Sequence, residues 1–297
     1  MEDILVTVSR ITKILNEKIW FKKLLNQVQD DSEKEKFSAA LINRTIAIYN
    51  KIDTQEDREI FEEILDEIDV LVLSDYSRLL NRCYIELRKK YPKIENFYVI
   101  PLLKKNSNED NKVKSGMFVS YLFNTYHFSF IDEVENFQGA KIKVIKYLDD
   151  NTLTKIEESE NSMIIFADDF VGTGTTVVSV YKSYFKNSLD FIETRTCLIA
   201  LSILDIGLEK INEEGIPLIF GTEFLSLTSK FKGNIDKKDN IIRVVRTLSN
   251  SFKIKNNKIG YKDSASTVIT IRTPNNNVPF LWSSKVNKRK PLFIRNE

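Results

Sequence analysis

The stretch that decides the fold is Met163-Ile-Ile-Phe-Ala-Asp-Asp-Phe-Val-Gly-Thr-Gly-Thr-Thr-Val177. Its apolar residues predict a buried strand over Met163–Ala167, which delivers two adjacent carboxylates, Asp168 and Asp169. A short loop with two glycines follows, and a helix is predicted from Thr175 onward. Glycines let backbone N–H groups approach an anion, threonine hydroxyls add donors, and a helix N-terminus favours negative charge. The pattern therefore predicts a phosphate-binding loop made of Gly172, Thr173, Gly174, Thr175 and Thr176.

Two common nucleotide-binding loops do not fit this stretch. The chain has only nine glycines, so two of them in one short loop indicate an unusual backbone requirement. A Walker loop needs a lysine after its last glycine, and none follows Gly174. The dinucleotide loop needs a small residue where Val177 stands, and it expects its acidic residue about twenty positions downstream. Two carboxylates directly before the loop instead fit a ribose 5-phosphate unit, in which vicinal hydroxyls lie beside a single phosphate.

At these residues the chain resembles the 5-phosphoribosyl-1-pyrophosphate (PRPP) motif of the type I phosphoribosyltransferases, in which four apolar and two acidic residues precede a Thr/Gly turn. The resemblance implies that Asp168 and Asp169 are the catalytic residues and hold the ribose hydroxyls, while Gly172–Thr176 hold the 5-phosphate. Since successive strand residues point to opposite sides, we expect one carboxylate to reach over the loop and the other to bend with it. Members that salvage purines often carry an Asp where Gly172 stands, which argues against an ordinary hypoxanthine/guanine enzyme.

The same family needs a pyrophosphate loop after an earlier strand. The best candidate is Lys114-Ser115-Gly116, at the start of a helix predicted over Gly116–Tyr126. Lysine supplies a cation, serine and N–H groups supply donors, and glycine allows close approach. A solvated turn capped by Ser115 explains the same residues equally well. The resemblance also implies a Mg²⁺ ion that bridges substrate oxygens and has no direct protein ligands.

The pattern of apolar residues along the chain changes near Pro92. Residues 1–91 read as an N-terminal helical subdomain, and the acidic stretch 53–69 is predicted to form a solvated helix face. From residue 92 onward, short apolar runs alternate with helix-length segments. This alternation predicts an α/β domain over residues 92–297 with a parallel, doubly wound sheet, as in type I phosphoribosyltransferases. The expected strands are Phe97–Leu103, Ile142–Leu148, Met163–Ala167, Thr196–Ile203 and Ile216–Phe220, with a further strand over Ser266–Thr273.

Two C-terminal segments are strongly basic. Residues 230–262 carry a net charge of +8, and residues 285–297 add +4. A solvated lysine-rich surface explains this charge, and the alternative is a surface that binds nucleic acid or a reverse-transcriptase nucleoprotein complex. The run Gly260–Trp282 resembles the end of a divergent phosphoribosyltransferase-like group from bacterial conflict and phage-defence loci, some encoded with retron reverse transcriptases. Residues 263–297 are expected to form a hood-like segment over the acceptor site, and a surface loop anchored by Phe280, Leu281 and Trp282 is the alternative.

The remaining composition excludes several classes of protein. Two cysteines, Cys83 and Cys197, exclude a disulfide scaffold, and a single histidine, His127, excludes a histidine-built metal site. No apolar run is long enough to span a membrane and no secretory signal is found, so we expect a cytoplasmic protein. The resemblance implies transfer of phosphoribosyl from PRPP to an unidentified acceptor, in a phage-defence or toxin effector. The alternative is a catalytically inactive nucleotide-sensing or nucleoprotein-assembly module, and the sequence leaves self-association into a homo-oligomer open.

Overall fold

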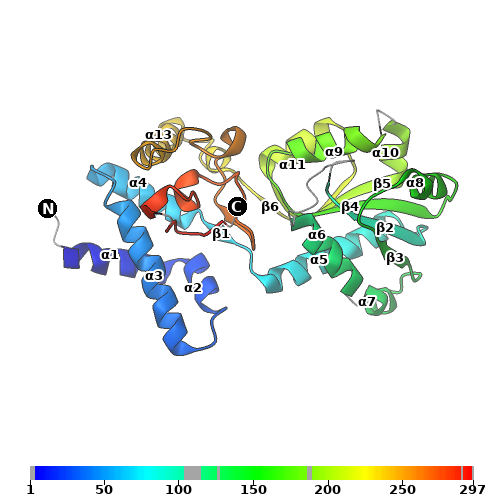
Figure 1. The fold of residues 1–297 in the computed structure, drawn as a ribbon, viewed down its shortest axis with the longest axis horizontal. Helices are drawn as coiled ribbons and strands as arrows, with labels where there is room; N and C mark the ends of the chain where they lie inside the picture. The colour runs from blue at the N-terminus through cyan, green and yellow to red at the C-terminus, as the bar shows by residue number, and fades with distance from the viewer. Residues whose placement is uncertain (1–3, 104–114, 126–127, 186–188, 289, 296–297) are drawn as a thin grey trace. The chain divides into compact units, whose positions relative to one another are not determined.

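The chain divides into two compact units in the computed structural model, which describes residues 4–103, 115–125, 128–185, 189–288 and 290–295 (Figure 1). Unit 1 combines residues 1–73 with residues 225–297, and unit 2 is residues 74–224. This division differs from the expected boundary at residue 91. The physical reason is that the apolar side chains of residues 225–297 are buried among the N-terminal helices.

Unit 2 is built on a five-stranded sheet with the order β3-β2-β4-β5-β6. All neighbouring strands run parallel, and in the register Val99 lies opposite Ile165, which in turn lies opposite Cys197. This confirms the predicted parallel sheet, because strands that are apolar along nearly their whole length need cover on both faces. The strands are β2 (Asn96–Pro101), β3 (Lys141–Val144), β4 (Ser162–Val171), β5 (Thr196–Leu204) and β6 (Leu218–Phe224).

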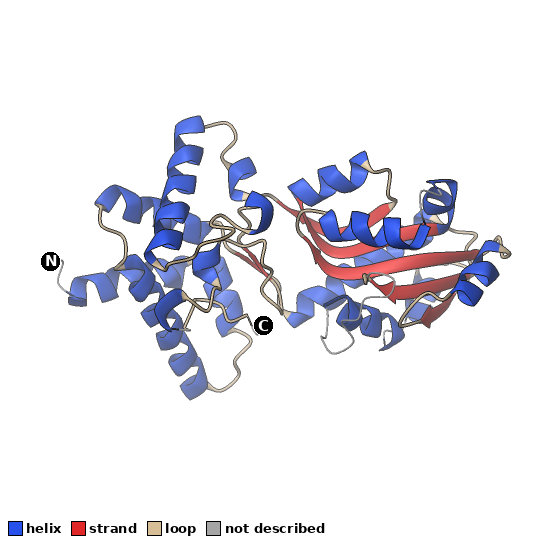
Figure 2. Ribbon diagram, turned by 45° about the horizontal axis from the view of Figure 1, so that its top comes forward, coloured by secondary structure: helices blue, strands red, loops and turns tan. Residues whose placement is uncertain are grey.

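Helices cover both faces of this sheet (Figure 2). On one face, Phe166 packs against Val180 and Tyr181 in a continuous apolar core. The helices of this face are α8 (Asp150–Glu157), α9 (Thr175–Phe185), α10 (Leu189–Arg195) and α11 (Asp205–Glu213). The opposite face is covered by α5 (Leu73–Lys90) and α6 (Ser115–Thr125), and α6 is followed by α7 (Phe128–Val134).

The central strand is longer than predicted. The prediction ended it at Ala167, but β4 continues to Val171, which lies opposite Ile203 of β5. The pairing persists because β5 is itself buried along its whole length, and the Ser202 hydroxyl donates a hydrogen bond to the Asp169 carbonyl oxygen at 2.8 Å. The two carboxylates therefore lie inside a strand and not at the start of a loop.

Unit 1 is mainly helical. Its core contains Trp20, Phe21 and Phe61 from the first part of the chain and Leu248 from the last part. The helices are α1 (Ile4–Glu17), α2 (Ile19–Leu25), α3 (Asp31–Tyr49), α4 (Gln55–Asp66), α12 (Leu227–Lys230) and α13 (Ile235–Ser251), with short 3-10 turns η1 (Tyr261–Asp263), η2 (Pro279–Leu281) and η3 (Val286–Lys288). Among the residues that the structure describes, no helix is long and apolar enough to cross a membrane.

The C-terminal segment supplies a strand and an anchor to unit 1. The strand predicted over Ser266–Thr273 is reduced to β7 (Val268–Ile269), which pairs in parallel with β1 (Asp69–Val70) in a separate two-stranded sheet. Phe280 and Leu281 are fully buried in the core of unit 1, and the Phe280 ring lies 5.9 Å from the Phe61 ring. Much of the segment expected to be hood-like is thus interior structure.

Candidate functional site

The order of the strands creates a switch point between β2 and β4. From β2 the chain moves outward to β3, and then it returns to β4 on the other side of β2. In open parallel sheets, ligands bind outside the carboxyl ends of the strands at such a point. The chain enters α6 at Ser115 after β2 and enters α9 at Thr175 after β4. Both loops predicted to bind PRPP therefore belong to this edge of the sheet.

Two residues of the predicted pyrophosphate loop contact the end of β4. The Ser115 hydroxyl donates to Oδ1 of Asp168 at 3.0 Å, and the backbone N–H of Asp169 donates to the same oxygen at 3.0 Å. A Cβ atom on Gly116 would stand 2.7 Å from the Ala167 carbonyl oxygen and 3.5 Å from Oδ1 of Asp168. Gly116 is therefore required by the close approach of α6 to β4. Lys114 lies outside the described residues.

The environment of Asp168 opposes its ionisation. Desolvation raises the pKa of the half-buried Asp168 carboxyl well above its ordinary value, and the negative charge of Asp169 raises it further. The hydrogen bonds from Ser115 and from the backbone of Asp169 act in the opposite direction but do not compensate. A ligand hydroxyl or a cation at this carboxyl would stabilise its charged form. Binding of such a group would therefore favour loss of the Asp168 proton.

Asp169 points toward the face of the sheet that α5 and α6 cover. Tyr76 of α5 donates its hydroxyl to Oδ2 of Asp169 at 2.8 Å, and both residues are buried, with exposed fractions of 1% and 4%. The regular alternation of a strand explains this placement, because β4 continues past both carboxylates. The structure thus joins Asp168 to Ser115 and Gly116, and it joins Asp169 to Tyr76. Tyr76 was missed by sequence reasoning because it looks like one more apolar-face residue of a long helix.

The glycine loop retains the features of an anion site. Gly174 has a φ of +68°, a left-handed conformation that favours glycine, and its carbonyl oxygen accepts from the N–H of Val178 at 3.1 Å. The hydroxyl oxygens of Thr173 and Thr175 lie 3.2 Å apart, and Thr176 is exposed. The first N–H groups of a helix have no partner within that helix, and the helix dipole favours a negative charge there. The start of α9 can therefore accept a phosphate.

Gly207 of α11 allows the glycine loop to pack closely against that helix. A Cβ atom on Gly207 would stand 2.4 Å from the carbonyl oxygen of Gly172, and one on Gly174 would stand 3.1 Å from the carbonyl oxygen of Gly207. The helix and the loop thus approach each other backbone to backbone. Sequence reasoning missed Gly207, although a glycine inside a helix costs about 1 kcal/mol relative to alanine and often marks a close approach.

The two cysteines of the chain are buried and protonated. Cys83 and Cys197 are buried free thiols, and desolvation raises the pKa of each to about 12, so neither is a thiolate at neutral pH. His127 lies outside the described residues. Within the described ranges, no group of three or more His, Cys, Asp or Glu side chains could hold a metal ion.

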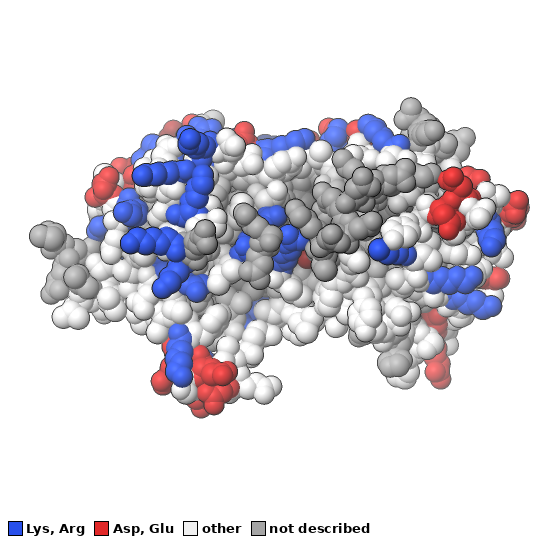
Figure 3. All heavy atoms as spheres, in the orientation of Figure 1, with Lys and Arg blue, Asp and Glu red and all other residues white. Residues whose placement is uncertain are grey.

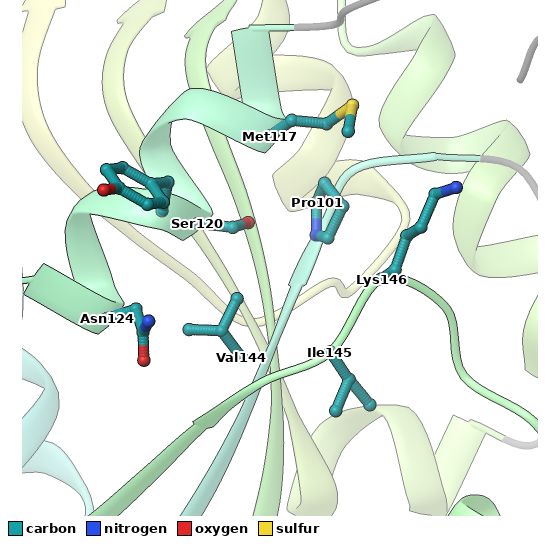
Figure 4. A pocket seen from close by; sticks show the side chains of 8 residues that line it. Pro101, Met117, Ser120, Asn124, Val144, Ile145 and Lys146 are labelled. Carbon is teal, nitrogen blue, oxygen red and sulfur yellow. The ribbon is translucent and has the colours of Figure 1, made fainter. Parts of the chain in front are cut away.

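A pocket of about 290 Å³ opens between α6 and the last residues of β2 and β3 (Figure 4). Its lining includes four apolar side chains and two polar ones from α6, but neither Asp168 nor the glycine loop. The four apolar side chains are Pro101, Met117, Val144 and Ile145, the two polar ones are Ser120 and Asn124, and Tyr121 and Lys146 complete the lining.

The basic segment 230–262 lies in unit 1 and is partly neutralised. Three of its side chains form ion pairs with the acidic stretch 53–69. Lys230 pairs with Glu67 at 2.8 Å, Lys237 with Glu63 at 3.1 Å, and Arg243 with Asp57 at 2.7 Å. The acidic stretch, predicted to be a solvated helix face, therefore also contacts the basic segment. Figure 3 shows further lysines and arginines over one face of this unit. Arg246, Lys253 and Lys255 are exposed.

The comparisons with known proteins cover most of the chain. The model of a family named PRTase-CE matches residues 21–295. Among solved structures, the orotate phosphoribosyltransferase of Aeropyrum pernix is similar at 12% sequence identity with a TM-score of 0.27, over 54% of this chain and 75% of that chain. No curated protein matches the chain.

Proposed function

The chain belongs to the PRTase-CE family, and from this premise we propose that it binds PRPP, or a related ribose 5-phosphate nucleotide, and transfers phosphoribosyl to an acceptor. The observation that carries the proposal is the placement of Asp168. This carboxyl lies at the switch point, it accepts a hydrogen bond from the candidate pyrophosphate loop, and it stands four residues before the glycine loop. The glycine loop, Asp168 and the candidate pyrophosphate loop would thus offer groups for the phosphate, the ribose and the pyrophosphate at one edge of the sheet.

The parts of PRPP would divide among the residues as follows. Gly172–Thr176 would hold the 5-phosphate through backbone N–H groups and threonine hydroxyls. Asp168 would accept from a ribose hydroxyl, and Ser115 and Gly116, with Lys114, would hold the pyrophosphate. Asp169 would act through its hydrogen bond to Tyr76, unless ligand binding turns its carboxyl away from that hydroxyl.

A Mg²⁺ ion fits this site only through its substrate. Asp168 and Ser115 offer oxygen donors, which Mg²⁺ prefers, but they do not form a closed cage. The ion would therefore be held by pyrophosphate and ribose oxygens and by water, and it would neutralise charge on the departing pyrophosphate. The chain's own residues would orient C1 of the ribose, where the bond to pyrophosphate breaks and the bond to the acceptor forms. Positioning and charge stabilisation are sufficient for such a displacement.

Calorimetric titration with PRPP tests the proposal. Asp168→Asn should weaken PRPP binding about ten- to hundredfold, because it removes a charge-assisted hydrogen bond worth about 1.5–3 kcal/mol. Asp169→Asn should weaken it less if the hydrogen bond from Tyr76 holds that carboxyl away from the ligand. Glu95→Gln is the matched control, since this exposed carboxylate lies just before β2, at the amino end of the sheet. Unchanged affinity in both Asp variants would end the phosphoribosyl hypothesis.

The pyrophosphate assignment has its own test. Lys114→Ala should weaken PRPP binding much more than ribose 5-phosphate binding, because only PRPP carries the diphosphate. Equal weakening of both ligands would place the lysine elsewhere.

We also propose that the protein acts as an effector in bacterial conflict. The alternative is an inactive nucleotide sensor on the same fold. The resemblance of Gly260–Trp282 to defence-associated proteins supports the effector role. Incubation with PRPP labelled in its ribose and with a cell extract distinguishes the two: an effector enzyme leaves label on an acceptor, whereas a sensor binds PRPP and leaves none.

A further inference from the structure

The structure divides the C-terminal positive charge of the chain into two parts. One part lies on α12 and α13, where Lys230, Lys237 and Arg243 form ion pairs with the acidic stretch 53–69. The other part follows α13: residues 252–295 contain ten basic residues and one acidic residue, a net charge of +9. The charge that a partner could use is therefore concentrated after the end of α13.

Two stretches of this region form one basic face on unit 1. Nζ of Lys285 donates a hydrogen bond to the carbonyl oxygen of Lys253 at 3.3 Å, so the turn after α13 and the run near the C-terminus lie side by side. Five lysines of these stretches are exposed, and none of them forms an ion pair among the residues that the structure describes. We call them the C-terminal basic face: Lys253, Lys255, Lys285, Lys288 and Lys290. Like charges gathered in this way repel one another, and an anionic partner would relieve that repulsion.

Buried apolar side chains hold the C-terminal basic face in place. Ile254 is buried between Lys253 and Lys255. Val286 and Leu292 are buried beside the lysines of the second stretch, and all three apolar residues belong to the core of unit 1. Charges on an anchored backbone lose less conformational freedom on binding than charges on a free tail. The structure thus presents a preformed surface.

Two lysines of this face have a backbone conformation that favours glycine. Lys253 has a φ of +57° and Lys288 a φ of +55°. Lys253 ends α13 in the turn that glycine usually forms: its N–H donates to the carbonyl oxygen of Asn250, and the N–H of Ile254 donates to that of Ser249, both at 2.8 Å. Lysine is less favourable than glycine in this conformation. A local rule broken without a gain in packing is a reason to look for a function of the side chain.

The aromatic residues near the face favour a duplex over a single strand. Proteins that bind single strands stack the bases on exposed aromatic rings. Tyr261 and Trp282 are only half-exposed. Lys262 lies over the first ring at 5.9 Å, and Arg295 lies over the second at 5.1 Å. Neither ring is therefore open for bases to stack on it.

The apolar side chains of the same region are too few for binding to a membrane surface. Segments that bind an anionic bilayer combine lysines with apolar side chains that enter it. Within the described part of residues 252–295, only Ile271 and Ile294 are large apolar side chains that are mostly exposed. Lysines without protruding apolar or aromatic neighbours are typical of contacts to nucleic-acid phosphates.

We propose that the C-terminal basic face binds the phosphate backbone of double-stranded nucleic acid without sequence preference. Each lysine would neutralise a phosphate as a point charge, and the released counterions would drive binding. Contacts to phosphates position a protein on a duplex but do not read its sequence. The inference goes beyond the proposed function, because the face belongs to unit 1, whereas Asp168 and the glycine loop belong to unit 2.

Fluorescence anisotropy with two labelled duplexes of unrelated sequence tests the proposal. The wild type should bind both with similar affinity, which should fall steeply between about 50 and about 200 mM salt. Lys285→Gln combined with Lys288→Gln should reduce the slope of log affinity against log salt by about 2. Lys141→Gln combined with Lys143→Gln is the matched control, because it removes the same charge from exposed positions of β3 in unit 2. Equal losses in the two double variants, or no binding by the wild type at the lowest salt, would overturn the proposal.

Lys253→Gly separates the charge from its effect on folding. Glycine suits the left-handed conformation, so the melting temperature should stay unchanged or rise, while the salt slope should fall by about 1. Asn257→Gly is the matched control, because Asn257 is exposed, has a φ of +51° and carries no charge. It should keep the affinity of the wild type. Unchanged affinity and salt slope in Lys253→Gly would contradict the proposal.

The same protein distinguishes the duplex from other anionic partners. A single strand should bind more weakly than the duplex, because its phosphates are less dense, and tighter binding of the single strand would overturn the proposal. Cosedimentation with phosphatidylserine vesicles in the absence of duplex binding would overturn it in favour of a membrane. Asp168→Asn should bind the duplex as the wild type does, so the loss of PRPP binding and the loss of duplex binding are separate results.

Discussion

The substitution Gly207→Ala tests whether the glycine loop holds a phosphate in the geometry described. The added Cβ atom would stand 2.4 Å from the carbonyl oxygen of Gly172, whereas ordinary contacts begin near 3.4 Å. The carbonyl belongs to the backbone and cannot rotate away as a side chain could. Either the loop or α11 must therefore move by about 1 Å, the shortfall between 2.4 Å and ordinary contact.

The displacement should affect binding more than stability. Overpacking of this kind costs about 1–3 kcal/mol, and alanine returns about 1 kcal/mol through its better helix propensity. The net loss of about 0–2 kcal/mol corresponds to a melting temperature lower by at most about 8 °C. A misplacement of about 1 Å at a positioned group can cost roughly a hundredfold in activity, so we expect a loss of affinity for ribose 5-phosphate that approaches this size.

Calorimetric titration with ribose 5-phosphate and a thermal melt on the same sample measure both effects. Gly139→Ala is the matched control, because a Cβ atom there meets nothing within 4 Å and the residue has no positive φ. The control should keep the affinity and the melting temperature of the wild type. If Gly207→Ala folds and binds ribose 5-phosphate as tightly as the wild type, the loop does not bind the phosphate in this conformation and the reasoning is refuted.

Three further outcomes follow from the described contacts. The raised pKa of Asp168 makes its ionised form costly in the folded state, so the wild type loses stability as pH rises through that pKa. The melting temperature of Asp168→Asn should therefore exceed that of the wild type by more near about pH 8 than near about pH 4. Tyr76→Phe leaves a buried oxygen of Asp169 without its donor and should lower the free energy of unfolding by about 1–3 kcal/mol in urea titrations, and an unchanged value would show that Tyr76 does not support Asp169. If the basic segment binds nucleic acid, replacing Lys253 and Lys255 with Gln should reduce the log–log salt slope by about 2 in fluorescence anisotropy with a labelled duplex, and absence of binding by the wild type at low salt would remove that hypothesis.

The sheet and its central loop could be predicted because their signals are local. Apolar runs separated by helix-length segments identified each strand of the parallel sheet, and the family match confirms the resemblance to type I phosphoribosyltransferases that Met163–Val177 suggested. The boundaries were less accurate: β6 begins at Leu218 and ends at Phe224, later than the predicted run. A polar strand end such as Thr222-Glu223 gives no apolar signal, and only its pairing with β5 extends the strand.

Features that depend on partners distant in the chain could not be predicted. The helical pattern of residues 1–91 gave no sign of β1, because this strand exists only through its pairing with Val268 and Ile269. The Tyr76 contact to Asp169 joins residues 93 positions apart, and nothing in the local pattern of either residue indicates the other. The approach of Gly207 to the loop was readable in principle, since a helix-interior glycine needs a reason.

The interrupted course of unit 1 has a consequence for the protein's synthesis on the ribosome. Every segment of unit 2 has been made once residue 224 has emerged, whereas unit 1 must wait for residues 225–297. At about 5–20 residues per second, this wait lasts roughly 4–15 s. During it, Phe21 and Phe61 lack the C-terminal side chains that later bury them, including Phe280. The nascent N-terminal helices are therefore the part of the chain most exposed to aggregation and to chaperone binding.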